Sequence, residues 1–211
     1  VKDVPISEER RNRKVELISD LKEALKNKGI LFTMIMFFLI QVCVMLLQPL
    51  ITMYVGQLMG QVNDEAVQMA GVIFSLAGIS GILAAPFWGK RGQRYGYVKT
   101  FCYITFGAGI VNLFQFFTTD VYQFAVVQFI YGLFLAGAIP NINANLAEVT
   151  DKSIRGKAFG LVTSAQMSGG FVGPLLGGAL GYFLPTKLVI ISTGIILISV
   201  AGYTYLKKVK A

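Results

Sequence analysis

The chain has 211 residues, of which 55% are hydrophobic and only 14% are charged, and its mean hydropathy is +0.63. This composition is too apolar for a soluble domain of that size, so the sequence predicts an integral membrane protein. The net charge of +8 does not indicate nucleic-acid binding, because the basic residues flank apolar segments and do not form one face of a soluble domain.

Residues 1–29 form a polar and charged leading segment in which nothing resembles a cleavable signal peptide. Apolar residues recur there at helical spacing among lysines, at Val15, Ile18, Leu21 and Leu25. This pattern predicts a basic amphipathic helix before the first apolar span. Such a helix either attaches to the anionic inner leaflet or is a solvated connector to an upstream part of a longer protein.

Six charge-free intervals follow, each about as long as a helix that crosses the hydrocarbon core. They predict an all-α integral membrane fold, a six-helix bundle over residues 30–206 with a short tail at 207–211. The expected spans are approximately 30–59, 67–88, 99–119, 121–147, 158–184 and 188–206.

The basic residues are distributed very unevenly between the two ends of these spans. Six spans place both termini on one side, where 18 of the 19 Lys and Arg residues would lie, and only Lys187 would lie on the other. Because basic residues accumulate on the cytoplasmic side, we expect cytoplasmic termini and a multi-pass location in the cell membrane, in a bacterium the cytoplasmic membrane.

The first span is unusually long and polar. Its 35 uncharged residues would make a helix of roughly 50 Å, so it must tilt, protrude or break, and Pro49 and Gly56 are the expected places. A polar stripe on one face of it either bonds a neighbouring helix or lines a watery cavity, and the sequence leaves both open. The stripe consists of Gln41, Met45, Gln48 and Thr52.

The fourth span carries a cluster of amides next to a proline. Asn141 and Asn145 are four residues apart, Asn143 lies between them, and Pro140 precedes the group. A helix break beside polar side chains favours a cavity wall that holds a polar substrate group. The alternative is that the asparagines are simply hydrated near the cytoplasmic end.

In the fifth span a glycine recurs at every fourth position, at Gly169, Gly173, Gly177 and Gly181. This spacing places the glycines on one face of a helix and lets another membrane helix approach closely. Pro174 within the strip removes one hydrogen bond and favours a bend. The strip therefore predicts a hinge and sealing surface and not a binding site.

Two loops carry recognisable motifs. Between the second and third spans we expect a tight basic turn, Gly89–Gly96, and between the fourth and fifth a loop, Glu148–Gly160, that leads into the glycine strip. The turn resembles the G-x-x-x-D-R-x-G-R signature of the major facilitator superfamily. The loop and strip resemble that family's R-G-x-A-x-G followed by G-x-x-x-G-P-x-x-G-G. The matching residues are Gly89, Arg94 and Gly96, then Arg155 and Gly156, then Gly169, Gly173, Pro174, Gly177 and Gly178.

The resemblance covers nearly the whole chain and implies the second half of such a transporter, helices seven to twelve, built from two three-helix repeats. It is most similar to bacterial multidrug exporters of the drug:proton antiporter type. The implied partners are the lipid bilayer, a small amphipathic substrate, and the N-terminal half of the same transporter or a second copy of this chain. Gln93 replaces the acidic residue of the turn signature and Tyr97 a basic one, so the family's charge-relay role for this turn does not carry over.

The spans hold no deeply placed Asp, Glu, Lys or Arg, and the chain has no histidine. Proton relays across membranes are usually built on such groups, so in a proton-coupled exporter we expect the titrating residues in the other half. This half would supply an uncharged cavity wall that suits amphipathic compounds. The candidate substrate-binding residues are Gln41, Met45, Gln48, Thr52, Phe74, Phe134, Asn141 and Asn145.

Two other classes of function differ from transport. An intramembrane enzyme needs a nucleophile with a base or a metal, and the spans offer none, so we expect no catalytic residue, no metal and no cofactor. The remaining alternative is a free-standing six-helix subunit or scaffold that dimerises.

Overall fold

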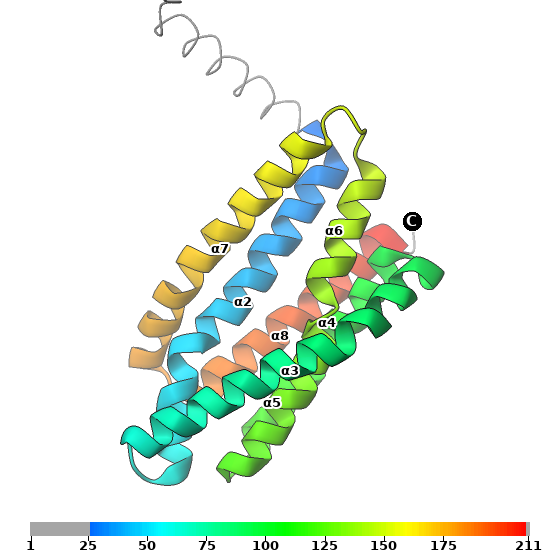
Figure 1. Cartoon of the computed structure of the whole chain (residues 1–211). Helices are drawn as coiled ribbons and strands as arrows, with labels where there is room; N and C mark the ends of the chain where they lie inside the picture. Colours follow the sequence, from blue (N-terminus) through cyan, green and yellow to red (C-terminus); the bar gives the residue numbers. More distant parts are fainter. Residues whose placement is uncertain (1–25, 210–211) are drawn as a thin grey trace, which may run out of the picture.

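The computed structural model describes residues 26–209, and within that part the chain forms helices and no strand (Figure 1). The amphipathic helix expected around residues 15–25 lies outside the described residues. In chain order the helices are α2 (Lys28–Met59), α3 (Asp64–Tyr95), α4 (Tyr97–Phe114) with a 3-10 extension (Gln115–Phe117), α5 (Val121–Leu135), α6 (Ala138–Val149), α7 (Arg155–Phe183) and α8 (Thr186–Thr204) with a π-helical turn (Tyr205–Val209).

Within the described residues, five segments are long and apolar enough to cross a membrane: α2, α3, α4 with its extension, α5 together with α6, and α8 with its last turn. The expected all-helical membrane fold is confirmed. Helix α7 has 29 residues, but it is not among the five, since its many glycine and polar residues lower its hydropathy.

Polar side chains and glycines define where several helices begin and end. Asn27, Asn63 and Asp120 cap the first turns of α2, α3 and α5, because their side-chain oxygens accept hydrogen bonds from free backbone N–H groups. Gly60 closes α2 with a φ of 74°, a left-handed conformation that glycine adopts without a steric penalty. The connections from α2 to α3 and into α5 are therefore encoded locally.

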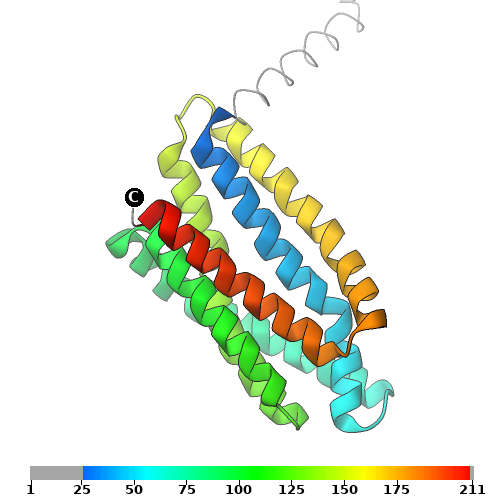
Figure 2. The same cartoon turned by 180° about the vertical axis from the view of Figure 1, so that it is seen from behind.

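Helix α2 occupies the middle of the bundle. Figure 1 shows α7 running alongside it over its length, and Figure 2 shows α8 beside it on the opposite face, next to α4. Helices α3 and α5 form a further pair. Because α2 contacts neighbours on several sides, about half of its residues are buried.

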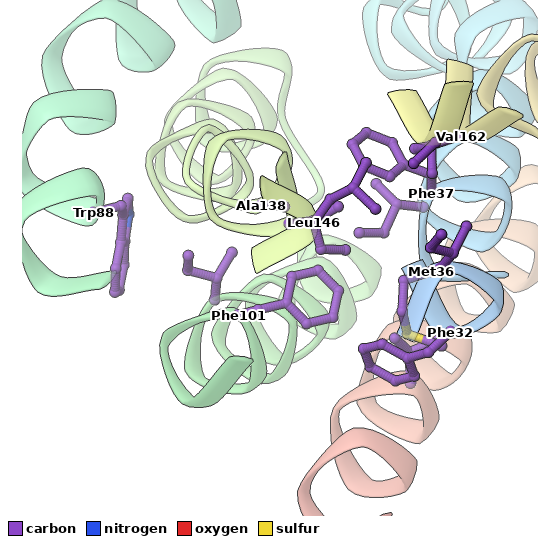
Figure 3. Packing of buried hydrophobic residues seen from close by; sticks show 14 of the residues in the cluster. Phe32, Met36, Phe37, Trp88, Phe101, Ala138, Leu146 and Val162 are labelled. Atoms are coloured by element: carbon purple, nitrogen blue, oxygen red, sulfur yellow. The ribbon is translucent and has the colours of Figure 1, made fainter. Parts of the chain in front are cut away.

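The largest core cluster joins the first half of α2 to five other helices, α3, α4, α6, α7 and α8. Figure 3 shows Phe32 and Phe37 of α2 facing a group that includes Phe101 of α4, Leu146 of α6 and Val162 of α7. Trp88 of α3 belongs to the same cluster. Burial of these large side chains stabilises the packing of α2 against α4, α6 and α7, since dispersion contacts and close packing dominate within a membrane.

One of the three alternatives for the long first span, a break, is excluded, and the expectation of a turn after the second span is wrong. Helix α2 does not break at Pro49 or Gly56 but continues to Met59, because the loss of one hydrogen bond at a proline is tolerated inside a membrane bundle. The expected tight turn over Gly89–Gly96 is instead the end of α3, and only Gly96 leaves the helix, with a φ of 92°. The basic residues of that segment thus project from the last turns of a helix.

Candidate functional site

A cavity of about 420 Å³ lies between α2, α3 and α5 and extends to the junction between α5 and α6. Of the residues that line it, none carries a charge, and most are aliphatic or aromatic. The polar groups in the lining are the amides of Gln41, Gln48 and Gln128 and the hydroxyl of Tyr131. A mostly apolar cavity with a few hydrogen-bonding groups is typical of a small-molecule site.

The α2 stripe contributes one wall of this cavity. Gln41, Met45 and Gln48 line it, and Phe74 of α3 lies in the opposite wall. Gln41 and Met45 are half-buried and Gln48 is exposed. The next member of the stripe, Thr52, is half-buried but does not line the cavity.

The asparagines of α6 do not line this cavity. Asn141 is buried, and its amide Nδ2 donates to the carbonyls of Trp88 at 3.3 Å and Gly137 at 2.8 Å, which ties α6 to α3. A Cβ added at Gly92 would collide with Asn141, so the glycine allows this close approach. Asn145 is also buried and does not line the cavity. The Asn141 amide therefore holds α6 and α3 together.

Phe134 also lies outside the cavity lining. Its ring centroid is 5.8 Å from that of Trp88, and its ring would collide with a Cβ added at Gly107 of α4. Phe134 thus packs between α3 and α4, in the same layer as the core cluster.

Helix α5 supplies a wall that the sequence reasoning missed. Gln128, Tyr131, Gly132 and Leu135 line the cavity, and their spacing of three, one and three residues places them on one helical face. Gln128 is 5% exposed, and its Oε1 accepts a hydrogen bond of 2.8 Å from Nε2 of Gln115. The signal in the sequence was the pair of polar side chains, Gln128 and Tyr131, which begins about two turns after the α5 N-cap Asp120.

The predicted break in the fourth span is confirmed, and it closes one end of the cavity. Helix α5 ends at Leu135 and α6 begins at Ala138, while Ala136 and Ile139 line the cavity. Pro140 has no N–H, so it cannot form the helical bond to the Ala136 carbonyl four residues earlier. The indole Nε1 of Trp88 donates to the Leu133 carbonyl at 2.7 Å and so compensates part of the interrupted hydrogen bonding.

The glycine strip of α7 packs directly on the backbone of α2. A Cβ added at Gly169 would lie 2.7 Å from the carbonyl oxygen of Phe38, and one at Gly177 would collide with the carbonyl of Leu46. Gly173 faces Met45 in the same way. Gly178 and Pro174 lie on the other side of α7, where Pro174 is exposed and the space around Gly178 is open. The strip is therefore a contact surface for α2.

A side-chain bond reinforces this contact. Nε2 of Gln166 in α7 donates to Oε1 of Gln41 in α2 at 3.3 Å. Because Gln41 also lines the cavity, the helix that forms the cavity wall is held from behind by α7. A shift of α7 along α2 would consequently change the wall.

Of the loop motif residues, Arg155 makes the most specific contacts. Its guanidinium Nη2 donates to the carbonyls of Ala147 at 2.7 Å and Thr150 at 3.4 Å, so it caps the C-terminal end of α6. Gly89, Gly96 and Gly156 each have open space where a Cβ would be, and Arg94 is exposed with its guanidinium 5.4 Å from the ring centroid of Tyr95.

Comparison with known proteins identifies similar sequences along most of the chain. The family model described as Major Facilitator Superfamily matches residues 33–210. The chain is 32% identical over 143 residues to the uncharacterized MFS-type transporter YuxJ of Bacillus subtilis (strain 168). The aligned segment covers 68% of this chain and 36% of the relative. The chain is 33% identical over 136 residues to the multidrug resistance protein MdtG of Yersinia enterocolitica, covering 64% of this chain and 32% of the relative. The MdtG of Escherichia coli (strain K12 / DH10B) is 32% identical over 136 residues. The matched segment thus spans about a third of these relatives' length.

Proposed function

This chain belongs to the major facilitator superfamily, and we propose that it forms the C-terminal half of a secondary active exporter of amphipathic small molecules. As a member of that family it is a multi-pass transport protein of the cell membrane and not an enzyme. Relatives that carry the name multidrug resistance protein support a drug-like substrate. The proposal of a half rests on the matched segment, which spans about a third of the relatives' length.

In this proposal α7 also crosses the membrane, as the fifth of six crossings in chain order. It lies along α2 over its length, and its charge-free part is long enough to span the hydrocarbon core. Both termini then lie on the cytoplasmic side, in agreement with the lysines near the start of α2 and after the end of α8. Glycine at the helix contact explains how a segment of modest hydropathy is accommodated, since its polar backbone is covered by α2.

The observation that carries the function is the uncharged cavity between α2, α3 and α5. Its volume of about 420 Å³ and its apolar walls suit part of an amphipathic compound, and the three glutamine amides offer hydrogen bonds to polar groups of different kinds. The lining has no carboxylate, so the groups that couple transport to protons belong to the N-terminal half.

Alternating access then uses the contact between α2 and α7. A smooth glycine surface permits close packing in more than one arrangement, and α2 carries the cavity wall on its other side. A small rocking movement at this contact would open or close the cavity towards one side of the membrane.

The test is an efflux assay in bacterial cells that lack their main drug exporters. The gene, with the coding sequence upstream of Val1, is expressed, the cells are loaded with ethidium, and loss of dye is followed after energy is restored. We expect faster efflux than in empty-vector cells, and an uncoupler of the proton gradient should abolish it. Efflux no faster than the empty vector contradicts an exporter of amphipathic cations, and efflux by residues 1–211 alone contradicts the half and supports a dimer.

A further inference from the structure

A second hollow lies on the opposite side of α2 from the cavity. It is a groove of about 350 Å³ between α2 and α8, and the outward-facing face of α8 is seen in Figure 2. Its walls come from Ile35 and Leu39 on α2 and from Ile196, Ser199 and Tyr203 on α8. No residue of this groove lines the α2–α3–α5 cavity, so the two are separate sites.

The walls of the groove suit a hydrocarbon chain. They are aliphatic except for Ser199 and Tyr203, and the Ser199 hydroxyl donates to the Ile195 carbonyl of its own helix at 2.8 Å. Ile35 is 44% exposed and Tyr203 is 48% exposed, so the groove is open to its surroundings. In a membrane-spanning protein those surroundings are lipid tails and neighbouring transmembrane helices.

A positive charge is held at one end of the groove. The Lys207 ammonium donates to the Tyr203 hydroxyl oxygen at 2.7 Å and lies 5.1 Å from the centroid of that ring. Tyr203 accepts this bond, so its own O–H remains available to donate. Lys28, at the start of α2, lies seven residues before Ile35, and the antiparallel arrangement of α2 and α8 brings it to the same end.

We infer that this groove binds one anionic phospholipid, with an acyl chain against Ile35, Leu39 and Ile196 and the phosphate group at Lys207 and Tyr203. An ammonium and a hydroxyl donor at the end of an apolar groove match a phosphodiester attached to an acyl chain. Charge complementarity decides for an anionic lipid, because its headgroup carries a net negative charge, while the cationic group of a zwitterionic headgroup offsets the phosphate. The aromatic ring of Tyr203 is placed where such rings favour the headgroup level. This inference does not use the transport cycle, so it can fail without affecting the proposed function.

The test uses the full chain, purified in detergent, delipidated and titrated with phosphatidylglycerol or phosphatidylcholine, with bound lipid counted by native mass spectrometry. We expect one phosphatidylglycerol to bind preferentially. Lys207→Gln should weaken its binding by about fivefold, the effect expected for one lysine near an anionic headgroup, and weaken phosphatidylcholine binding less. Glycerol phosphate without acyl chains should not compete, because it cannot fill the groove.

A second variant tests the acyl-chain part. Ser199→Phe should fill the groove and lower the binding of both lipids. Its matched control is Ser164→Phe in α7, because both serines are exposed and bond the carbonyl four residues before them. Lys99→Gln is the control for Lys207→Gln, since Lys99 is exposed near the same end of the bundle. Equal binding of the two lipids, or equal losses in Lys207→Gln and Lys99→Gln, would overturn the inference.

Discussion

A Cβ added at Gly173 would lie 2.7 Å from the Cβ of Met45, and 3.1 Å from both the backbone nitrogen of Leu46 and the carbonyl oxygen of Val42. This places the middle of the α7 strip directly behind a residue that lines the cavity. Real Cβ atoms do not approach other atoms this closely, so any side chain at position 173 must push α2 and α7 apart. The glycine therefore determines the position of the cavity wall.

The first prediction follows from that contact. Gly173→Ala should lower the thermal unfolding midpoint of the purified protein, with a cost of roughly 1–3 kcal/mol for an overpacked helix contact. It should also slow dye efflux by the full-length transporter. Gly178→Ala is the matched control, because the space around it is open and alanine is the better helix former. Equal midpoints for the two variants would argue against the strip as the contact that fixes α2.

The sequence carried enough information for the helices and for the strip, but not for all partners of the asparagines. Apolar length and small-residue spacing are local properties, so α2, α8 and the face of α7 could be read directly. The role of Asn141 depends on which carbonyl lies opposite it. Trp88, whose carbonyl accepts from Asn141, is 53 residues away in the chain. No local pattern predicts that pairing.

The same limit explains the α3 end and the α5 wall. Gly89 and Gly92 predicted a turn because glycine is common in turns, but Gly92 is needed for the approach of Asn141 and stays helical. The polar face of α5 was visible as the spacing of Gln128 and Tyr131. It was not assigned to the cavity because periodicity gives a helix face and not its direction towards a neighbour.

The second prediction separates a structural amide from a cavity amide. Asn141→Ala removes two buried hydrogen bonds, so it should lower the unfolding midpoint and reduce efflux of every dye in the same proportion. Gln48→Ala removes an exposed cavity amide, so it should leave the midpoint unchanged and alter the relative efflux of different dyes. Efflux of several dyes of different polarity, measured for both variants, checks this. A changed dye preference in Asn141→Ala with an unchanged unfolding midpoint would indicate that Asn141 contacts the substrate.

The third prediction concerns the α5 wall. Gln128→Leu should change dye preference less than Gln48→Ala does, because Gln128 lines the cavity but is only 5% exposed, while Gln48 is exposed. It also leaves the Gln115 amide without its partner, so the free energy of unfolding should fall by about 1–2 kcal/mol and the unfolding midpoint with it. Gln68→Leu on the exposed face of α3 is the control. If both leucine variants retain the wild-type dye preference, Gln128 does not contact substrate.

The fourth prediction tests the helix break. Trp88→Phe keeps an aromatic ring in the core but removes the indole donor to the Leu133 carbonyl, and should destabilise the protein by about 1–2 kcal/mol. Circular dichroism is the suitable measurement, because Trp88 is the chain's single tryptophan and the variant loses tryptophan fluorescence. Phe87→Leu, next to it on the exposed side of α3, is the control for loss of a ring contact. A midpoint in Trp88→Phe as high as in the wild type would show that the carbonyl needs no donor.

The fifth prediction concerns the loop before the strip. Arg155→Gln removes a guanidinium that bonds two carbonyls at the C-terminal end of α6, where a positive charge also interacts favourably with the helix dipole. The α6–α7 connection should then open more often, which limited proteolysis after Lys152 would detect as faster cleavage. The control for loss of a positive charge is Lys157→Gln, in the first turn of α7, because this variant keeps the cleavage site at Lys152. An unchanged cleavage rate in Arg155→Gln would mean that other contacts hold the loop. One such contact is the close packing of Val149 against Gly29, because a Cβ added at Gly29 would lie 3.2 Å from Val149 Cγ2.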